Sequence, residues 1–173
     1  PLGINLRNAS SDPKAVPEKT SFWRAETKFR LLSIGRLTYY KGFEILIKAV
    51  SQMPEVELLI VGSGELQEPL EDLIRRTTPP DAQPATRLLG AVDEDQKHAL
   101  LAQCDLFCLA SRERTEAFGV VLLEAMQHSR PCLVTDLPGS GMPWVVSHAH
   151  CGLHVPFEDV DAWRSSIARL QHD

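Results

Sequence analysis

Short apolar segments alternate with segments of helical period from residue 29 to the end of the 173-residue chain. The apolar segments, which we interpret as strands, are residues 29–35, 56–61, 87–89, 105–109, 131–135 and 153–155. The predicted helices are 42–53, 66–76, 93–102, 118–128 and a last one from 159 onward. The strands are apolar throughout rather than at every second residue, which is typical of a parallel sheet covered on both faces. The pattern therefore predicts an α/β fold with a doubly wound parallel sheet.

The first 28 residues differ from the rest of the chain. They are polar, contain three prolines and follow neither the strand period nor the helix period. We therefore predict a linker or an irregular surface segment at 1–28 and one domain at 29–173, a size that suits a single hydrophobic core.

Charge and hydropathy argue against two classes of partner. The chain has 18 basic and 23 acidic residues and a formal net charge of -5, which disfavours a nucleic-acid-binding surface. No apolar run approaches the roughly 18 residues that cross a bilayer. We expect no membrane-spanning helix in this chain.

The cysteines and histidines give no clear metal or disulfide pattern. The chain has four cysteines and no CxxC pair, and Cys104, Cys108 and Cys132 lie in or beside predicted strands. We predict buried thiols, with a disulfide as the lesser alternative. Residues 148–154 hold three histidines and one cysteine, but their spacing matches no structural zinc site, so a polar loop is favoured over a metal site.

The loop after the first predicted strand carries two cations. Doubly wound sheets bind ligands outside the carboxyl ends of their strands, so these loops are the candidate site. Arg36 leaves the strand end and Lys41 opens the next helix. Two cations and a helix N-terminus together suit a compact polyanion such as a diphosphate. The alternative is two solvated surface charges.

The loop after the fourth predicted strand carries two glutamates. Glu116 precedes a helix and Glu124 lies two turns inside it, which separates them by roughly 12 Å along the helix axis. That separation is too large for an acid/base pair at one glycosidic bond, but it suits carboxylates that bind hydroxyls at two ends of an extended ligand. The amides of Phe118, Gly119 and Val120 form a helix N-terminus between them. The alternative is a pair of solvated glutamates.

The loop after the second predicted strand contains Gly62 and Gly64. A dinucleotide-binding fingerprint needs a third glycine at position 67, where Gln67 stands, so the sequence argues against a nicotinamide cofactor. We interpret the glycines as a tight turn between strand and helix, with close approach to a ligand as the lesser alternative.

Five segments together carry a resemblance to a known family. They are GRLTYYKG at 35–42, VGSGE at 61–65, LGAV at 89–92, EAFGVVLLEAM at 116–126 and TDLPGSGMPWV at 135–145. In this order they resemble the C-terminal, nucleotide-sugar-binding domain of the retaining glycosyltransferases of the GT-B fold, family 4, also called glycosyl transferases group 1. The resemblance extends over essentially the whole chain.

The resemblance implies roles for individual residues. Arg36 and Lys41 would bind the donor diphosphate and stabilise it as the leaving group, and Glu116 would bind hydroxyls of the donor sugar; these three form the expected catalytic set. Glu124 would bind the ribose hydroxyls. The other expected donor-binding residues are Gly35, Gly62, Gly90, Ala91, Val92, Phe118, Gly119 and Val120, with 90–92 in the base pocket. No metal and no cofactor is expected beside the donor, a GDP- or UDP-sugar.

The resemblance also implies an activity. The full-length enzyme would transfer a hexose, with mannose favoured, to a polysaccharide or lipid-linked acceptor with retention of configuration. It would act in the cytoplasm and be peripheral at the inner membrane through an N-terminal acceptor domain. That domain is expected outside this sequence, so this chain is expected to bind a donor without turnover. The alternatives are a non-catalytic nucleotide-sugar-binding module and a GT-B sugar-nucleotide epimerase or hydrolase.

Three residues depart from the family pattern or have no role in it. Ser129 stands where the family usually has glycine, so a strained or altered turn is expected there. Arg112 and Arg114 lie beside the expected donor pocket without an assigned role.

Overall fold

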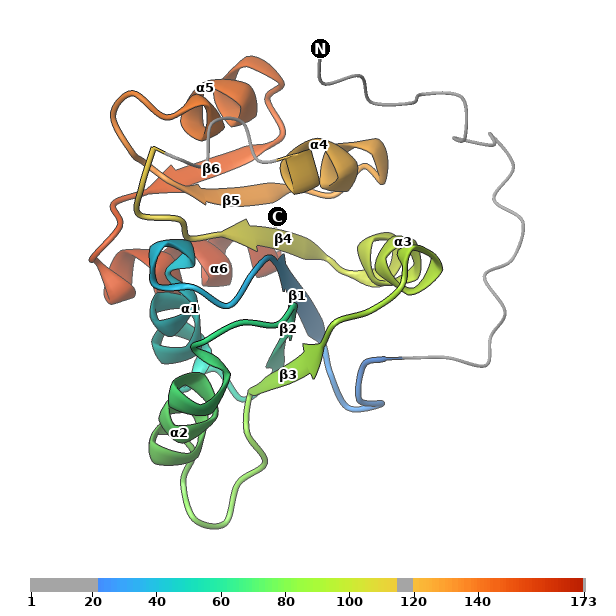
Figure 1. Ribbon diagram of the computed structural model, residues 1–173, viewed down its shortest axis with the longest axis vertical. Coiled ribbons are helices and arrows are strands. Elements are labelled where there is room, and N and C mark those ends of the chain that lie inside the picture. The colour runs from blue at the N-terminus through green and yellow to red at the C-terminus, as the bar shows by residue number, and fades with distance from the viewer. Residues whose placement is uncertain (1–21, 115–119, 173) are drawn as a thin grey trace.

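A six-stranded parallel sheet forms the centre of the protein (Figure 1). The computed structural model describes residues 22–114 and 120–172. The strands run in the order β3-β2-β1-β4-β5-β6 across the sheet. Their bounds are β1 Phe29–Ile34, β2 Val56–Val61, β3 Thr86–Gly90, β4 Leu106–Leu109, β5 Cys132–Thr135 and β6 Gly152–Val155. The helices are η2 Tyr39–Lys41 (a 3₁₀ helix), α1 Phe43–Val50, α2 Gln67–Thr77, α3 Glu94–Gln103, α4 Val120–Gln127, α5 Gly141–His148 and α6 Val160–His172.

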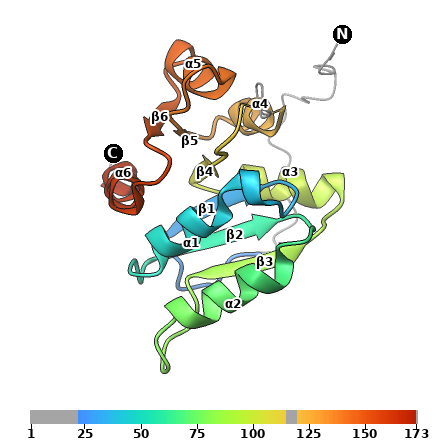
Figure 2. The ribbon, with the colours of Figure 1, turned by 60° about the vertical axis from the view of Figure 1, so that its left-hand side comes forward.

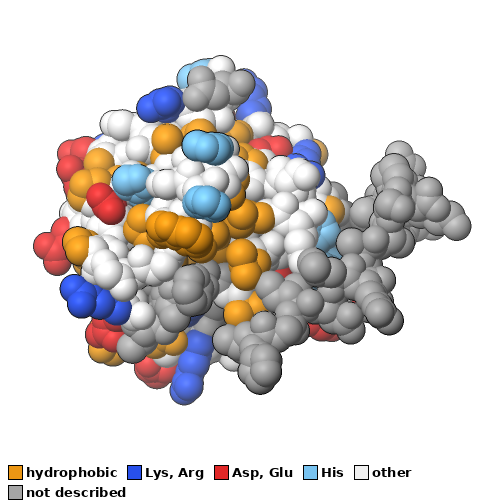
Figure 3. Space-filling view, turned by 90° about the horizontal axis from the view of Figure 1, so that it is seen from above, with side chains coloured by type: hydrophobic (Ala, Val, Ile, Leu, Met, Phe, Trp, Pro, Cys, Tyr) orange, Lys and Arg blue, Asp and Glu red, His pale blue; other side chains and the backbone are white. Residues whose placement is uncertain are grey.

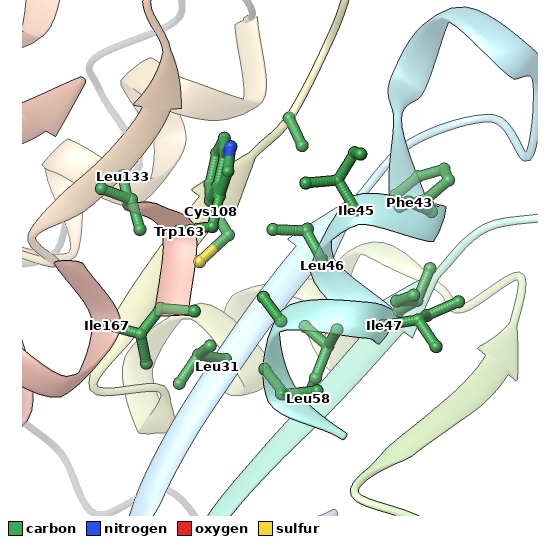
Figure 4. Close-up of a cluster of buried hydrophobic side chains, with 14 of the residues drawn as sticks. Leu31, Phe43, Ile45, Leu46, Ile47, Leu58, Cys108, Leu133, Trp163 and Ile167 are labelled. Atoms are coloured by element: carbon green, nitrogen blue, oxygen red, sulfur yellow. The ribbon is translucent and has the colours of Figure 1, made fainter. Parts of the chain in front are cut away.

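The doubly wound parallel sheet predicted from the sequence is confirmed. Successive residues of each strand face opposite sides, so Leu31 packs with α1 and α6 while its neighbour Leu32 packs with α3, α4 and α5. Figure 2 shows α1 and α2 along one face of the sheet, and Figure 4 shows Leu31, Leu46 and Trp163 meeting in the core on that side. Both faces are covered, which explains why apolar residues occupy both sides of the strands.

One helix was not expected from the sequence. Residues 141–148 form α5, whereas the apolar periodicity predicted no helix there and placed His148 in a polar loop. Gly141 and Pro143 mask the signal, but proline is tolerated in the first turn of a helix because its missing N–H has no partner there. The Ser140 side chain caps this turn by accepting a hydrogen bond from the Met142 N–H at 3.3 Å.

The cysteine prediction is confirmed. Cys104, Cys108 and Cys132 are buried, Cys151 is half-buried, and all four thiols are free. Burial raises the pKa of the Cys104 thiol to about 12. The thiol is therefore protonated at neutral pH and packs as an apolar group.

A buried carboxylate ties the residues before β1 to the sheet. Glu57, at the start of β2, accepts hydrogen bonds from the Arg24 N–H at 3.0 Å, the Thr27 hydroxyl at 2.7 Å and Arg87 Nε at 2.7 Å. Burial alone would raise the pKa of Glu57, but these hydrogen bonds outweigh it and leave the pKa below its usual value.

Ser129 adopts the strained turn expected of it. Its φ is 55°, in the left-handed region that favours glycine, and it lies two residues after the end of α4. Its N–H donates to the carbonyl of Met126 at 2.9 Å, and the Arg130 N–H donates to the carbonyl of Ala125 at 3.0 Å. This pair of bonds is the Schellman arrangement that ends many helices. The end of α5 repeats it with His150 at a φ of 50°.

We predict that Ser129→Gly raises the free energy of unfolding by about 0.5–1 kcal/mol, because relief of left-handed strain exceeds the entropy that glycine adds to the unfolded chain. Urea denaturation at constant m-value measures the change. The matched control is Ser51→Gly, at the end of α1, where φ is -57° and glycine relieves nothing. Equal effects of the two substitutions would contradict the strain at Ser129.

Candidate functional site

Backbone hydrogen bonds join the loops that follow β1, β2 and β3 at the carboxyl edge of the sheet. The Gly35 N–H donates to the Val61 carbonyl at 2.9 Å, and the Gly62 N–H donates to the Gly90 carbonyl at 2.8 Å. The Leu37 N–H donates to the Ser63 carbonyl at 2.9 Å. The three loops are therefore fixed to one another rather than independently placed.

Gly62 and Gly64 allow the loops to approach this closely. A Cβ at residue 62 would lie 1.9 Å from the Gly35 carbonyl oxygen, and one at residue 64 would lie 2.5 Å from that of Leu37. Both distances are far inside van der Waals contact. The tight-turn interpretation of these glycines is therefore confirmed, and what they approach is the chain's own backbone.

A pocket of about 560 Å³ lies on this edge, a volume within the range of small-molecule sites. Its lining residues are Ile34, Gly35, Arg36, Val61, Gly62, Ser63, Gly64, Ala91, Val92 and Lys97. Five expected site residues, at positions 35, 36, 62, 91 and 92, meet there from three different loops. Gly90, at the end of β3, supports the pocket through its bonded carbonyl rather than lining it.

Two cations lie at the end of β1. Arg36 is exposed, and within residues 22–114 and 120–172 its guanidinium forms no ion pair. Lys41 is only 8% exposed, and its side chain lies against Gly35: a Cβ on that glycine would be 3.0 Å from Lys41 Cε and 3.2 Å from Nζ. The buried side chain of Lys41 therefore lies against Gly35, the residue directly before the exposed Arg36.

Glu124 reaches the same region from α4. Its Oε1 lies 2.9 Å from Lys97 Nζ, and the same ammonium lies 2.8 Å from Glu94 Oε2. Burial alone would lower the pKa of Lys97, but its hydrogen bonds to Glu94 and Glu124 outweigh burial and raise it. Lys97, which lines the pocket, therefore stays charged and holds the Glu124 carboxylate in place through this contact.

The sequence pattern did not indicate a role for Lys97. Its partner Glu124 is 27 residues away, so no local spacing relates the two. One local feature could have indicated it. Asp93 and Gln96 form a capping box at the start of α3, which places residue 97 one turn into this helix, close to the loop after β3.

Part of the expected site lies outside the described residues. Glu116, Phe118 and Gly119 belong to this part. Val120 begins α4 and is 49% exposed.

A second pocket, of about 420 Å³, lies at the opposite, amino-terminal edge of the sheet. Its buried carboxylate, Glu57, is already bonded to Arg24, Thr27 and Arg87. Because the hydrogen bonds of Glu57 are made within the protein, we assign this carboxylate a structural role rather than a role in ligand binding.

The histidine tract at 148–154 is spread over separate elements. His148 stacks on Trp144 of α5 with ring centroids 4.9 Å apart, and His154 Nδ1 on β6 lies 3.5 Å from Asp136 Oδ2. On the face seen in Figure 3, hydrophobic side chains gather beside histidines. In the part of the chain that the structure describes, no three His, Cys, Asp or Glu side chains form a metal-binding group.

Comparison with known proteins identifies the family. The model of the family described as glycosyl transferases group 1 matches residues 17–173. The chain belongs to this family. The D-rhamnosyltransferase WbpZ of Pseudomonas aeruginosa is 32% identical over 165 residues, which cover 91% of this chain and 40% of that protein. The O-antigen chain mannosyltransferase C of Escherichia coli is 28% identical over 171 residues, which cover 98% of this chain and 43% of that protein.

Solved structures of glycosyltransferases share the fold. HepE of Anabaena, solved in complex with UDP, superposes with a TM-score of 0.74 at 26% identity, over 86% of this chain and 40% of that one. The group 1 chain described here thus spans less than half the length of these relatives. None of the helices in the described ranges is long and apolar enough to cross a membrane.

We predict that Gly62→Ala lowers the free energy of unfolding by about 3 kcal/mol, because the new Cβ would collide with the Gly35 carbonyl. Gly90→Ala is the matched control: its φ is also positive, at 72°, but a Cβ there meets nothing within 4 Å. We expect the control to cost about 1 kcal/mol from backbone strain alone. If urea denaturation gave equal losses of unfolding free energy for the two variants, the close contact between the loops at Gly62 would not contribute to stability.

Two histidines, His98 of α3 and His128 in the turn after α4, make the stability of the protein depend on pH. His98 Nδ1 and His128 Nε2 lie 3.0 Å apart, within hydrogen-bonding distance. Burial, then His98 and Arg130, lower the pKa of His128, while Glu124 opposes them weakly. The folded protein therefore binds fewer protons here than the unfolded chain.

We predict that the contribution of His128 to stability is fully present above the ordinary histidine pKa of about 6.5 and is lost as the pH drops below it. His98→Gln removes one cause of the lowered pKa and should flatten this loss between pH 7.5 and pH 5.5 in thermal denaturation. His172→Gln, at the end of α6, should leave the profile unchanged. A profile unaffected by His98→Gln would refute the coupling.

Proposed function

We propose that this chain is the donor-binding part of a retaining glycosyltransferase that transfers a hexose from a nucleoside diphosphate sugar. The observation that carries the proposal is Arg36, an exposed cation that lines the pocket at the end of β1, with the Lys41 side chain against Gly35 and with Glu124 held by Lys97, which also lines the pocket. A nucleoside diphosphate sugar has a diphosphate between a sugar and a ribose. Cations suit the diphosphate, and carboxylates on either side suit the hydroxyl groups of the sugar and the ribose.

The cations explain how this chain assists the reaction. The bond between the anomeric carbon and the diphosphate oxygen breaks, and the leaving nucleoside diphosphate keeps the electron pair. The oxygen of an acceptor hydroxyl forms the new bond to the anomeric carbon, and its proton passes to an oxygen of the leaving diphosphate. Negative charge therefore grows on the diphosphate in the transition state, and the preorganised charges of Arg36 and Lys41 stabilise it there. In this proposal no resident metal is needed, and Glu116 binds hydroxyls of the sugar.

The remaining residues bind the nucleoside. Glu124 accepts hydrogen bonds from the ribose hydroxyls, and Lys97 holds its carboxylate in place. Ala91 and Val92 offer apolar surface to the base. A GDP-sugar, GDP-mannose foremost, is our first choice of donor because the relatives include a GDP-mannose-dependent mannosyltransferase of Corynebacterium glutamicum. A UDP-sugar is the second, supported by the UDP complex of HepE.

The acceptor is a polysaccharide or a lipid-linked saccharide. Relatives named for O-antigen and phosphatidyl-myo-inositol support this class. Because those relatives are more than twice as long as the matched region, we assign acceptor binding to a further domain of the full-length protein. The reaction would take place in the cytoplasm, at the inner membrane, where such acceptors lie.

We predict that the protein binds one of GDP, UDP and ADP preferentially in calorimetric titration. Arg36→Ala should weaken binding by about 10- to 100-fold, because hydrogen bonds to charged groups contribute about 1.5–3 kcal/mol. Glu124→Gln keeps the shape of the side chain but removes its charge, and should weaken binding by about 10-fold.

The matched controls are Arg75→Ala and Glu55→Gln, which remove one member of an exposed ion pair far from the pocket. Both should bind like the unmodified protein. Binding of no diphosphate, or binding that neither Arg36→Ala nor Glu124→Gln affects, would overturn the proposed site.

A further inference from the structure

Arg112 joins the segment after β4 to the segment that carries Lys41. Its backbone N–H donates to the Tyr40 carbonyl at 2.8 Å. Its guanidinium pairs with the carboxylate of Glu44 and lies over the ring of Phe157, with Cζ 4.5 Å from the ring centroid. Arg112 thus contacts η2, α1 and the turn between β6 and α6.

These contacts flank Lys41 in the chain. Tyr40 precedes it, and Glu44 lies in the first turn of α1, three residues after it. Gly42, between them, packs so tightly on the backbone before Arg112 that a Cβ there would lie 2.1 Å from the Ala110 carbonyl oxygen. The position of Lys41 is therefore set by the segment after β4 as well as by its own strand.

A second link lies beside the first. The hydroxyl of Tyr39 donates to the carboxylate of Glu113, and this hydrogen bond, with the charge of Glu113, raises the pKa of Tyr39. Tyr39 is 56% exposed, so this contact is screened by water and weaker than that of Arg112.

Charge balance gives the Arg112–Glu44 pair a second effect. Both side chains are mostly buried, with exposed fractions of 30% and 26%, so the pair is less screened than a surface pair. Without Arg112, the Glu44 carboxylate would be an uncompensated negative charge at the start of α1. It would compete with an anion for Lys41.

We propose that Arg112 is a positioning residue for Lys41: it does not line the pocket, but it fixes residues 39–44 so that the ammonium meets the donor diphosphate. This inference rests on the proposed function. It also gives a role to an arginine that the sequence left unassigned.

A double-mutant cycle tests the inference by calorimetric titration with GDP and GMP, or with UDP and UMP if the uridine nucleotide binds more tightly. Arg112→Ala should weaken diphosphate binding by about 10-fold and monophosphate binding by less than twofold, because a small displacement of a positioned group is costly. In a Lys41→Ala background, Arg112→Ala should have no further effect, since the group that it positions is gone.

Two further variants keep the test decisive. Arg112→Lys retains the charge and the backbone hydrogen bond but not the planar contact with Phe157, so it should fold and weaken diphosphate binding by several-fold. It decides the question if Arg112→Ala does not fold. Arg75→Ala, an arginine in an ion pair on α2, should have no effect.

The outcomes separate this inference from the proposed function. Additive effects of the Arg112 and Lys41 substitutions, or equal losses for diphosphate and monophosphate, would overturn the positioning role alone. So would a loss with Lys41→Ala and none with either Arg112 variant. Failure of the unmodified protein to bind any nucleoside diphosphate would overturn both.

Discussion

The contact between Gly62 and the carbonyl of Gly35 is the constraint on which the candidate site depends. At that point the loops after β1 and β2 touch backbone to backbone, with no room for a side chain. The loop after β3 joins them through the bond from the Gly62 N–H to the Gly90 carbonyl. Because three parallel strands end together, their loops form one rigid edge, and the pocket is the hollow between them.

Some cations at the carboxyl edge of the sheet are paired with carboxylates, whereas the guanidinium of Arg36 is not paired with one among the described residues. Lys97 is balanced by Glu94 and Glu124, and Arg112 is balanced by Glu44. Arg36, at the end of β1, has no such carboxylate among the described residues. An anion in the pocket would therefore be drawn to the end of β1, and the neighbouring carboxylates would be held away from it by their own partners.

The fold could be predicted from the sequence where the signal is local. β2 was predicted at its observed bounds because five of its six residues are apolar, and α3 was predicted to start after Asp93 because a side-chain cap marks that end. α5 was not predicted because its first turn contains glycine and proline, which are rare inside helices. The pattern also predicted which loops meet at the edge. It could not predict the roles of Lys97 and Arg112, since their partners come from elements that only the strand order brings near.

The most direct test of the account is a crystal structure of the protein with bound GDP or UDP, whichever binds more tightly. The account predicts the diphosphate within hydrogen-bonding distance of Arg36 and Lys41, and the ribose hydroxyls against Glu124. A nucleotide in the 420 Å³ pocket at the amino-terminal edge, or one that touches neither Arg36 nor Glu124, would contradict it.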